Sequence, residues 1–132
     1  MSNLTPGDGQ DLFARWKQAW ERRDVDLAMS LFTDHVDYRY NPFEPPLIGG
    51  NAVRAHWNDS VADAQDVELD AERIWVVGST VIATWHSAYT SPSRQERIRW
   101  RGVTTFELND EGLVERLRQW SAERAEPVGG AA

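Results

Sequence analysis

Three histidines carry most of the proton-transfer chemistry open to this sequence. They are His35, His56 and His86, and the chain contains no cysteine. The lack of cysteine excludes thiolate nucleophiles, disulfides and cysteine-based zinc sites. No His-x-His or His-Glu-x-x-His spacing and no glycine-rich phosphate loop occurs, so we expect no metal site and no cofactor. The most useful remaining group is a neutral imidazole, whose ordinary pKa lies near physiological pH and suits a general base.

His86 lies in a predicted strand, residues 80–91, in which alternate residues share a face. Ile82 and Thr84 fall on its side, while Trp85 falls on the other. If the His86 side faces a cavity, His86 is the best general base and Thr84 lies beside it. The alternative is a histidine at a strand edge or a dimer surface, because a lone histidine is rarely catalytic.

Aromatic residues supply the second group of candidate site residues. Tyr38 and Tyr40 alternate along a predicted strand, residues 36–40, so either could donate a phenolic hydrogen bond into a cavity or pack the core. His56 could close a pocket mouth or lie partly exposed on its helix. Three tryptophans could form a wall for a flat apolar ligand or pack the core instead: Trp16, Trp57 and Trp120.

The composition restricts the class of protein. A net charge of -7 argues against a nucleic-acid partner, which normally needs a basic surface. No apolar run approaches the ~20 residues that span a bilayer, and the first twelve residues resemble no targeting signal. We therefore expect no membrane partner and a cytoplasmic protein.

Hydrophobic periodicity predicts helices before strands. Helices are expected at residues 11–22, 24–32 and 51–62, and strands at 36–40, 66–77, 80–91, 96–109 and 113–121. Short polar turns join the last four strands, which is typical of an antiparallel meander. The pattern predicts one α+β domain over residues 10–124, with flexible tails at 1–9 and 125–132.

One run of landmark residues suggests a family. An amphipathic helix carrying Phe13, Trp16 and Trp20 leads through Glu21-Arg22-Arg23-Asp24 to Thr33-Asp34-His35-Val36-Asp37-Tyr38-Arg39-Tyr40, then Asn41-Pro42 and Gly49-Gly50. This order resembles the nuclear transport factor 2-like superfamily, which includes ketosteroid isomerases, SnoaL-like polyketide cyclases and limonene epoxide hydrolases. The resemblance implies a cone-shaped, strongly curved, mostly antiparallel sheet wrapped around three N-terminal helices. It also implies a central pocket and a homodimer.

The catalytic residues of these relatives do not carry over. The isomerase positions for the oxyanion-hole Tyr, the base and the second Asp fall on Trp16, Tyr40 and Thr104. The cyclase acid/base position before Trp120 holds Gln119, whose amide can hold a carbonyl but cannot shuttle a proton. The arginine-bridged aspartate pair of limonene epoxide hydrolases has no match either. The resemblance therefore implies the fold and a ligand pocket, but assigns no reaction.

The same resemblance turns the His86 side of its strand toward the pocket. It makes His86 and Tyr40 the candidate catalytic residues. The candidate ligand-binding residues are Trp16, Tyr38, His56, Trp57, Thr84, Thr104, Gln119 and Trp120. The first hypothesis is a protein that binds a small apolar or aromatic molecule and acts as an acid/base isomerase, cyclase, dehydratase or hydrolase. The second is a non-catalytic dimerising or carrier domain whose pocket is plugged by its own tryptophans.

The outer face of the sheet carries two further expectations. Trp75, Trp85 and Tyr89 would mark a homodimer interface there. The arginines of residues 94–101 would form either a carboxylate-binding patch or a solvent face paired with the acidic residues of 68–72.

Overall fold

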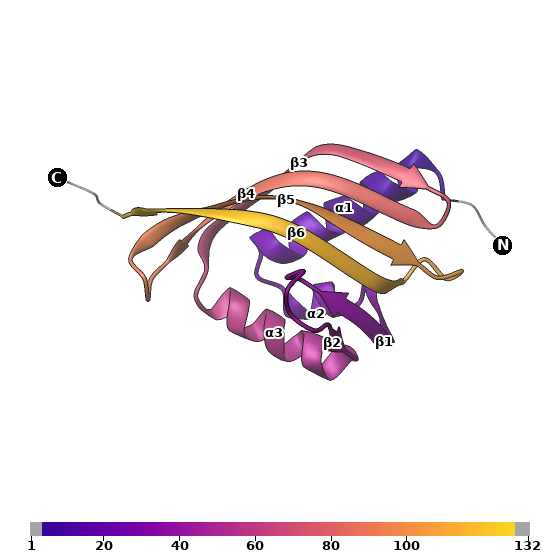
Figure 1. Ribbon diagram of the computed structural model, residues 1–132, viewed down its shortest axis with the longest axis horizontal. Helices are drawn as coiled ribbons and strands as arrows, with labels where there is room; N and C mark the ends of the chain where they lie inside the picture. The colour runs from indigo at the N-terminus through magenta and orange to yellow at the C-terminus, as the bar shows by residue number, and fades with distance from the viewer. Residues whose placement is uncertain (1–3, 129–132) are drawn as a thin grey trace.

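The computed structural model describes residues 4–128, which form three helices and one six-stranded sheet (Figure 1). In chain order the elements are α1 (Pro6–Glu21), α2 (Val25–Met29), β1 (Phe32–Arg39), β2 (Leu47–Ile48), α3 (Gly50–Ala62), β3 (Gln65–Val77), β4 (Thr80–Ser91), β5 (Glu96–Leu108) and β6 (Val114–Pro127). The sheet order is β2-β1-β6-β5-β4-β3. The predicted α+β cone is confirmed.

All neighbouring strands of the sheet are antiparallel except β1 and β6, which run parallel. The four long strands β3 to β6 form a curved band, with α1 behind it and α2 and α3 below it in Figure 1. We call the side of the sheet that faces the helices the concave face, and the opposite side the convex face. Within residues 4–128, no helix is both long and apolar enough to cross a membrane.

Regular secondary structure begins earlier and ends later than the bounds predicted for the helices and strands. Helix α1 begins at Pro6, because Thr5 and Asp8 form a reciprocal capping box. Strand β6 continues to Pro127, which pairs with Glu96. Residues 6–9 therefore lie in helix α1 and residues 125–127 in strand β6, while residues 1–3 and 129–132 lie outside the described residues. Asp24 is the N-cap of α2, since its carboxylate accepts from the Leu27 N–H at 3.0 Å.

Aromatic side chains form the centre of the core. The Trp16 ring meets Trp57 and Phe106 edge to face, with centroids 5.3 and 5.2 Å apart. Trp20 stacks on Trp57 at 3.9 Å. Trp57 is fully buried, so its indole packs between α1 and α3 rather than facing a ligand directly.

Strand β4 presents the opposite face to the one expected. Trp85 lies on the concave face and is 6% exposed, whereas the His86 side chain is 49% exposed on the convex face. The prediction that the Thr84 and His86 side turns toward the pocket is wrong. So is the assignment of Trp85 and Tyr89 to an outer dimer face. The physical reason is that Val81, Ala83 and Trp85 form the more apolar side, which the core covers.

Candidate functional site

A cavity of about 510 Å³ lies between the helices and the concave face of the sheet. Its wall is largely aromatic: Trp16, Trp20, Tyr38, Tyr40, Phe43, Trp85, Tyr89 and Trp100. Its other polar side chains are Asn41, His56, Ser60, Ser87, Gln119 and Ser121. No aspartate or glutamate is among the described residues that line it. The size is within the usual range for small-molecule sites, and the lining suits an apolar ligand with few polar groups.

His56 is the titratable base of this cavity. It lies on α3, where its imidazole stacks on the Tyr40 ring at 4.1 Å and lies 5.8 Å from the Tyr38 ring. Burial lowers the pKa of His56 below its usual value of 6.5, and the nearby Asp59 opposes that shift in part. The imidazole is therefore neutral at neutral pH, which is the form that accepts a proton.

The imidazole nitrogens of His56 are available to a ligand. Ser60 donates its hydroxyl proton to the backbone carbonyl of His56 at 2.9 Å, so this contact does not occupy the ring. No hydrogen bond to the ring is found from residues 4–128. Either ring nitrogen is therefore open to a hydrogen bond with a ligand in the cavity.

Tyr38 supplies a hydroxyl that stays protonated. The side chain is 1% exposed, and burial raises the pKa of its phenol far above the usual value of 10.0. The indole of Trp57 lies close enough to oppose this shift, although its N–H meets no acceptor at hydrogen-bond distance. Tyr38 can therefore donate a hydrogen bond but cannot act as a base near neutral pH.

A buried polar chain backs the sheet side of the cavity. The Trp85 indole N–H donates to the Thr104 hydroxyl at 2.8 Å, and that hydroxyl donates to the Gln119 carbonyl oxygen at 3.4 Å. Thr104 is fully buried, while Gln119 lines the cavity. Gln119 is thus connected to the sheet interior through its side chain.

The predicted site residues divide into three groups. The cavity lining contains Trp16, Tyr38, Tyr40, His56 and Gln119. Trp57 and Thr104 are fully buried outside the lining. Thr84, His86 and Trp120 lie on the convex face, and Trp120 is 45% exposed. The two candidate catalytic residues, His86 and Tyr40, therefore do not share a cavity, and the histidine that lies beside Tyr40 is His56.

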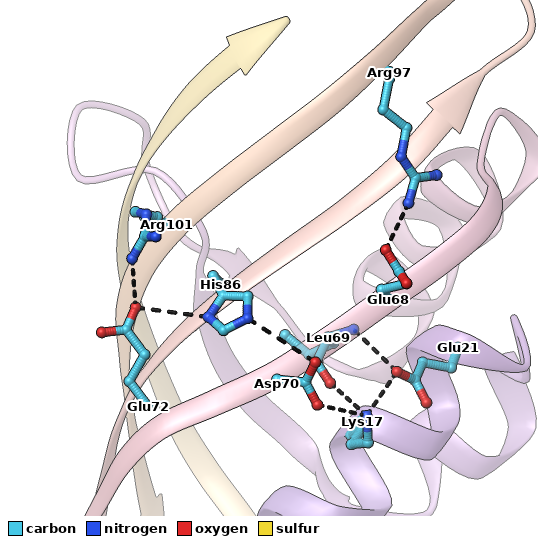
Figure 2. Close-up of polar contacts among 9 residues, drawn as sticks. All are labelled: Lys17, Glu21, Glu68, Leu69, Asp70, Glu72, His86, Arg97 and Arg101. Carbon is cyan, nitrogen blue, oxygen red and sulfur yellow. Dashed lines mark hydrogen bonds and ion pairs between the residues drawn. The ribbon is translucent and has the colours of Figure 1, made fainter.

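His86 belongs instead to a charged cluster on the convex face (Figure 2). Its imidazole nitrogens lie 4.0 Å from an Asp70 oxygen and 3.7 Å from a Glu72 oxygen. Asp70 also contacts Lys17 of α1 at 3.0 Å, and Glu72 contacts Arg101 at 2.9 Å. The Lys17–Asp70 and Arg101–Glu72 contacts are exposed ion pairs, which contribute little stability individually.

Two of the three arginines of β5 reach across β4 to acidic residues of β3. Arg97 pairs with Glu68 at 2.8 Å, and Arg101 pairs with Glu72 as described (Figure 2). Of the two interpretations of this stripe, the structure supports a solvent face paired across the sheet. Within residues 4–128 no group of three metal-binding side chains is found.

The fold agrees with the comparison with known families. The SnoaL-like domain family matches residues 13–116. This chain belongs to that family. A search of curated proteins found no match for this SnoaL-like domain.

Several solved structures share the fold of this SnoaL-like domain. The epoxide hydrolase/cyclase-like enzyme SalBIII, described in pyran ring formation in salinomycin, is 20% identical with a TM-score of 0.77, covering 88% of this chain and 92% of its own. A putative SnoaL-like polyketide cyclase from Shewanella denitrificans is 15% identical, with a TM-score of 0.78 and coverages of 89% and 92%. A computationally designed 17-OHP binder is 18% identical, with a TM-score of 0.74 and coverages of 89% and 97%. At these identities the likeness shows the fold alone.

Sequence reasoning missed part of the lining of this SnoaL-like domain. Ser87 and Tyr89 follow Trp85 on the concave side of β4, and Trp100 and Ser121 come from β5 and β6. The signal for β4 was present, because Val81, Ala83 and Trp85 make that side the more apolar one. For Trp100 and Ser121 no local signal distinguishes a cavity position from a core position.

Proposed function

We propose that this SnoaL-like domain binds a small, mostly apolar molecule in its cavity and that His56 exchanges a proton with it. The observation that carries the proposal is a neutral imidazole in an aromatic cavity whose described lining holds no carboxylate. Because no carboxyl group of residues 4–128 lines the cavity beside this base, the ligand is the group that would supply the proton there.

The proton step is simple in chemical terms. A neutral His56 nitrogen accepts a proton from a carbon or oxygen of the ligand, and the resulting imidazolium returns it to another position or to water. The hydroxyls of Tyr38 and Tyr40 can donate hydrogen bonds to an oxygen where negative charge develops. Isomerisation, cyclisation, dehydration and hydrolysis all contain such a step.

The relatives of this fold support a small-molecule ligand. One is described as an epoxide hydrolase/cyclase-like enzyme and another as a designed binder of 17-OHP. The first description concerns pyran ring formation in a polyether and the second the binding of 17-OHP, and an aromatic cavity of about 510 Å³ suits an organic ligand. The proposal for this chain rests on its own lining residues, with the relatives as support.

Proton exchange can be tested before the natural ligand is known. The probe is 2-tetralone, a flat bicyclic ketone with an acidic C–H next to its carbonyl. We would follow exchange of that hydrogen for deuterium in D2O by NMR, with the wild-type protein, His56→Gln and His86→Gln. The expected result is faster exchange with wild type and His86→Gln, and the buffer rate with His56→Gln.

The matched pair of histidine variants decides the outcome. Exchange that survives in His56→Gln would overturn the role of His56, because another base would then be responsible. Exchange lost in His86→Gln would show that the convex-face histidine reaches the reaction after all. Both substitutions keep a polar side chain, so thermal unfolding should confirm that each variant is folded.

Binding without catalysis is the second candidate function. It is favoured by Trp16, Tyr40 and Thr104, which occupy the positions where the isomerases have their catalytic residues. The probe for binding is Prodan, an uncharged naphthalene ketone whose fluorescence reports the polarity around it. Prodan that binds stoichiometrically, together with 2-tetralone exchange at the buffer rate, would favour the carrier role. The open cavity argues against a plugged pocket, because Trp120 lies outside it and Trp57 is buried behind its wall.

We also propose that the domain forms a homodimer through the convex face. Trp75 of β3 and Trp120 of β6 are 38% and 45% exposed on that face, and Val77, two residues after Trp75, is 62% exposed. Light scattering of the wild type and of Trp120→Glu tests this. A dimer that becomes a monomer in the variant is expected, and a wild-type monomer would contradict it.

A further inference from the structure

The orientation of the Gln119 amide follows from the groups behind it. Trp85 donates its indole N–H to the Thr104 hydroxyl at 2.8 Å, and an indole N–H can only donate. The Thr104 hydroxyl thus uses one lone pair as acceptor and keeps its own proton to donate. The Thr104 hydroxyl donates this proton to the Gln119 side-chain oxygen at 3.4 Å. The amide therefore presents its oxygen to the sheet interior.

The other end of the same amide is the NH₂ group. Gln119 is half-buried and belongs to the cavity lining, so a group that is not engaged by Thr104 is available to the cavity. Among residues 4–128, the hydrogen bond found for the Gln119 side chain involves only its oxygen. An amide NH₂ is a donor, and its natural partner is an acceptor oxygen of a ligand.

Gly102 makes room for this chain of hydrogen bonds. A Cβ at this position would lie 2.7 Å from Cζ2 of Trp85 and 2.7 Å from the backbone oxygen of Trp120. The indole therefore passes across β5 directly over the glycine, which is what allows its N–H to reach Thr104 on the same strand. The chain from Trp85 to Gln119 is consequently built into the packing of the sheet.

We propose that the Gln119 amide N–H donates to a carbonyl oxygen of the ligand, which makes carbonyl compounds of low polarity the substrate class of this cavity. This inference rests on the proposed function. A carbonyl oxygen accepts hydrogen bonds and donates none, so it matches the NH₂ group. A ligand hydroxyl would gain less, because the NH₂ group cannot accept the hydroxyl proton. The aromatic lining accommodates the remainder of the molecule.

The donor and the base come from different walls of the cavity. His56 is on α3, and Gln119 is on β6 of the sheet. When His56 removes a proton from the carbon next to the carbonyl, the C–H electron pair moves into the new C–C double bond. The carbonyl π electrons move onto the oxygen. The Gln119 N–H stabilises that oxygen, and the reverse movement returns the proton to carbon, so the step is balanced without a co-reactant.

The test uses Prodan labelled with ¹³C at its carbonyl, bound to the wild type and to Gln119→Met. Methionine has nearly the same length as glutamine and no hydrogen-bond donor. In isotope-difference infrared spectra, the wild type should lower the carbonyl stretching frequency relative to Prodan in hexane. Gln119→Met should move it back toward the hexane value and weaken binding by about tenfold, the usual effect of one hydrogen bond.

A ligand without the carbonyl is the matched control. The analogue has a propyl group in place of the propionyl group of Prodan. It should bind the wild type and Gln119→Met equally, because neither protein offers it a hydrogen bond. An equal loss for both ligands would overturn the inference, since it would show that Gln119 only shapes the cavity.

The role of Thr104 needs a separate pair of variants. Thr104→Val removes the hydroxyl and should let the amide rotate, so the carbonyl frequency should become broad and shift toward the hexane value. Thr104→Ser keeps the hydroxyl and should retain the wild-type frequency. If Thr104→Val does not fold, the comparison of Thr104→Ser with Gln119→Met still tests the donor.

These outcomes separate the inference from the proposed function. Prodan that fails to bind the wild type would overturn both the apolar ligand site and the carbonyl contact. Prodan that binds with its carbonyl frequency unchanged from hexane would leave the ligand site intact and overturn the Gln119 contact alone. Deuterium exchange of 2-tetralone that depends on His56 but not on Gln119→Met would likewise retain the base and reject the donor.

Discussion

The two faces of β4 differ as much as a protein core differs from its surface. Trp85 lies on the concave face, buried and bonded to Thr104, and contributes to the cavity wall. Its neighbour His86 lies on the convex face among Asp70 and Glu72 (Figure 2). Adjacent residues of one strand thus have different surroundings, because successive side chains point to opposite faces of the sheet.

The same comparison applies to the two histidines. His86 is half-exposed between carboxylates, where solvent weakens every interaction. His56 is stacked on Tyr40, and its burial lowers its pKa. A histidine's suitability as a base depends on these surroundings more than on its presence in the sequence.

The largest expected effect distinguishes the two faces directly. Trp85→Ala should lower the free energy of unfolding by about 3–5 kcal/mol, because it removes a buried indole and leaves a cavity. His86→Ala should change it by less than about 0.5 kcal/mol, as for most surface substitutions. Urea denaturation of both variants measures this. Equal losses would show that the convex face is as tightly packed as the concave one.

A smaller effect is expected at Gly102, where the Trp85 indole packs against the backbone of β5. Gly102→Ala should cost about 1–3 kcal/mol, because the added carbon would overlap the Trp85 ring and the Trp120 backbone. Arg101→Ala, one residue away and exposed, is the control and should cost less than about 0.5 kcal/mol. A neutral Gly102→Ala in urea denaturation would mean that the indole has room to move.

Ion pairs within the convex face allow a finer comparison. The Asp37–Arg118 pair at 2.9 Å is 27% and 18% exposed, while the Glu72–Arg101 pair at 2.9 Å is 44% and 76% exposed. Asp37→Asn should cost about 1–2 kcal/mol, because it weakens a sheltered, charge-assisted hydrogen bond between β1 and β6. Glu72→Gln should cost under about 0.5 kcal/mol. If added salt lowered the cost of both substitutions equally, the difference in burial would not explain why the two ion pairs contribute differently to stability.

The smallest effect concerns the pH dependence of His56. Its folded pKa lies below the value of 6.5 for the free side chain, so below that pH the unfolded chain binds the proton more readily. Wild-type stability should therefore fall relative to His56→Gln as the pH drops from about 7.5 to 5.5. Thermal unfolding at each pH measures the difference. A gap that stays constant would contradict the burial of the imidazole.

The fold was largely predictable because its signals are local. The apolar spacing of the helices and the alternation of β4 are each readable within one turn or one strand. The start of α1 was misplaced because the Thr5 capping box precedes the first apolar residue of the helix. Strand β2 escaped prediction because it has two residues and follows two prolines.

The candidate site was less predictable. Tyr38, Tyr40, His56 and Gln119 were all expected near a ligand and do line the cavity. The choice of His86 over His56 failed because it depended on which face of β4 turns inward. Alternation divides a strand into two sets of residues, but a resemblance at low identity does not say which set is covered.

By itself the sequence determined the order of helices and strands, the two-sided character of each strand, and the absence of cysteine chemistry. Only the tertiary structure decided that His56 lies beside Tyr40, that Gln119 is oriented by Thr104, and that His86 is excluded from the cavity. The physical reason is the range of the interactions. Capping and periodicity act over a few residues, whereas the cavity brings together α3 and β6, whose pairing is set by the packing of the whole core.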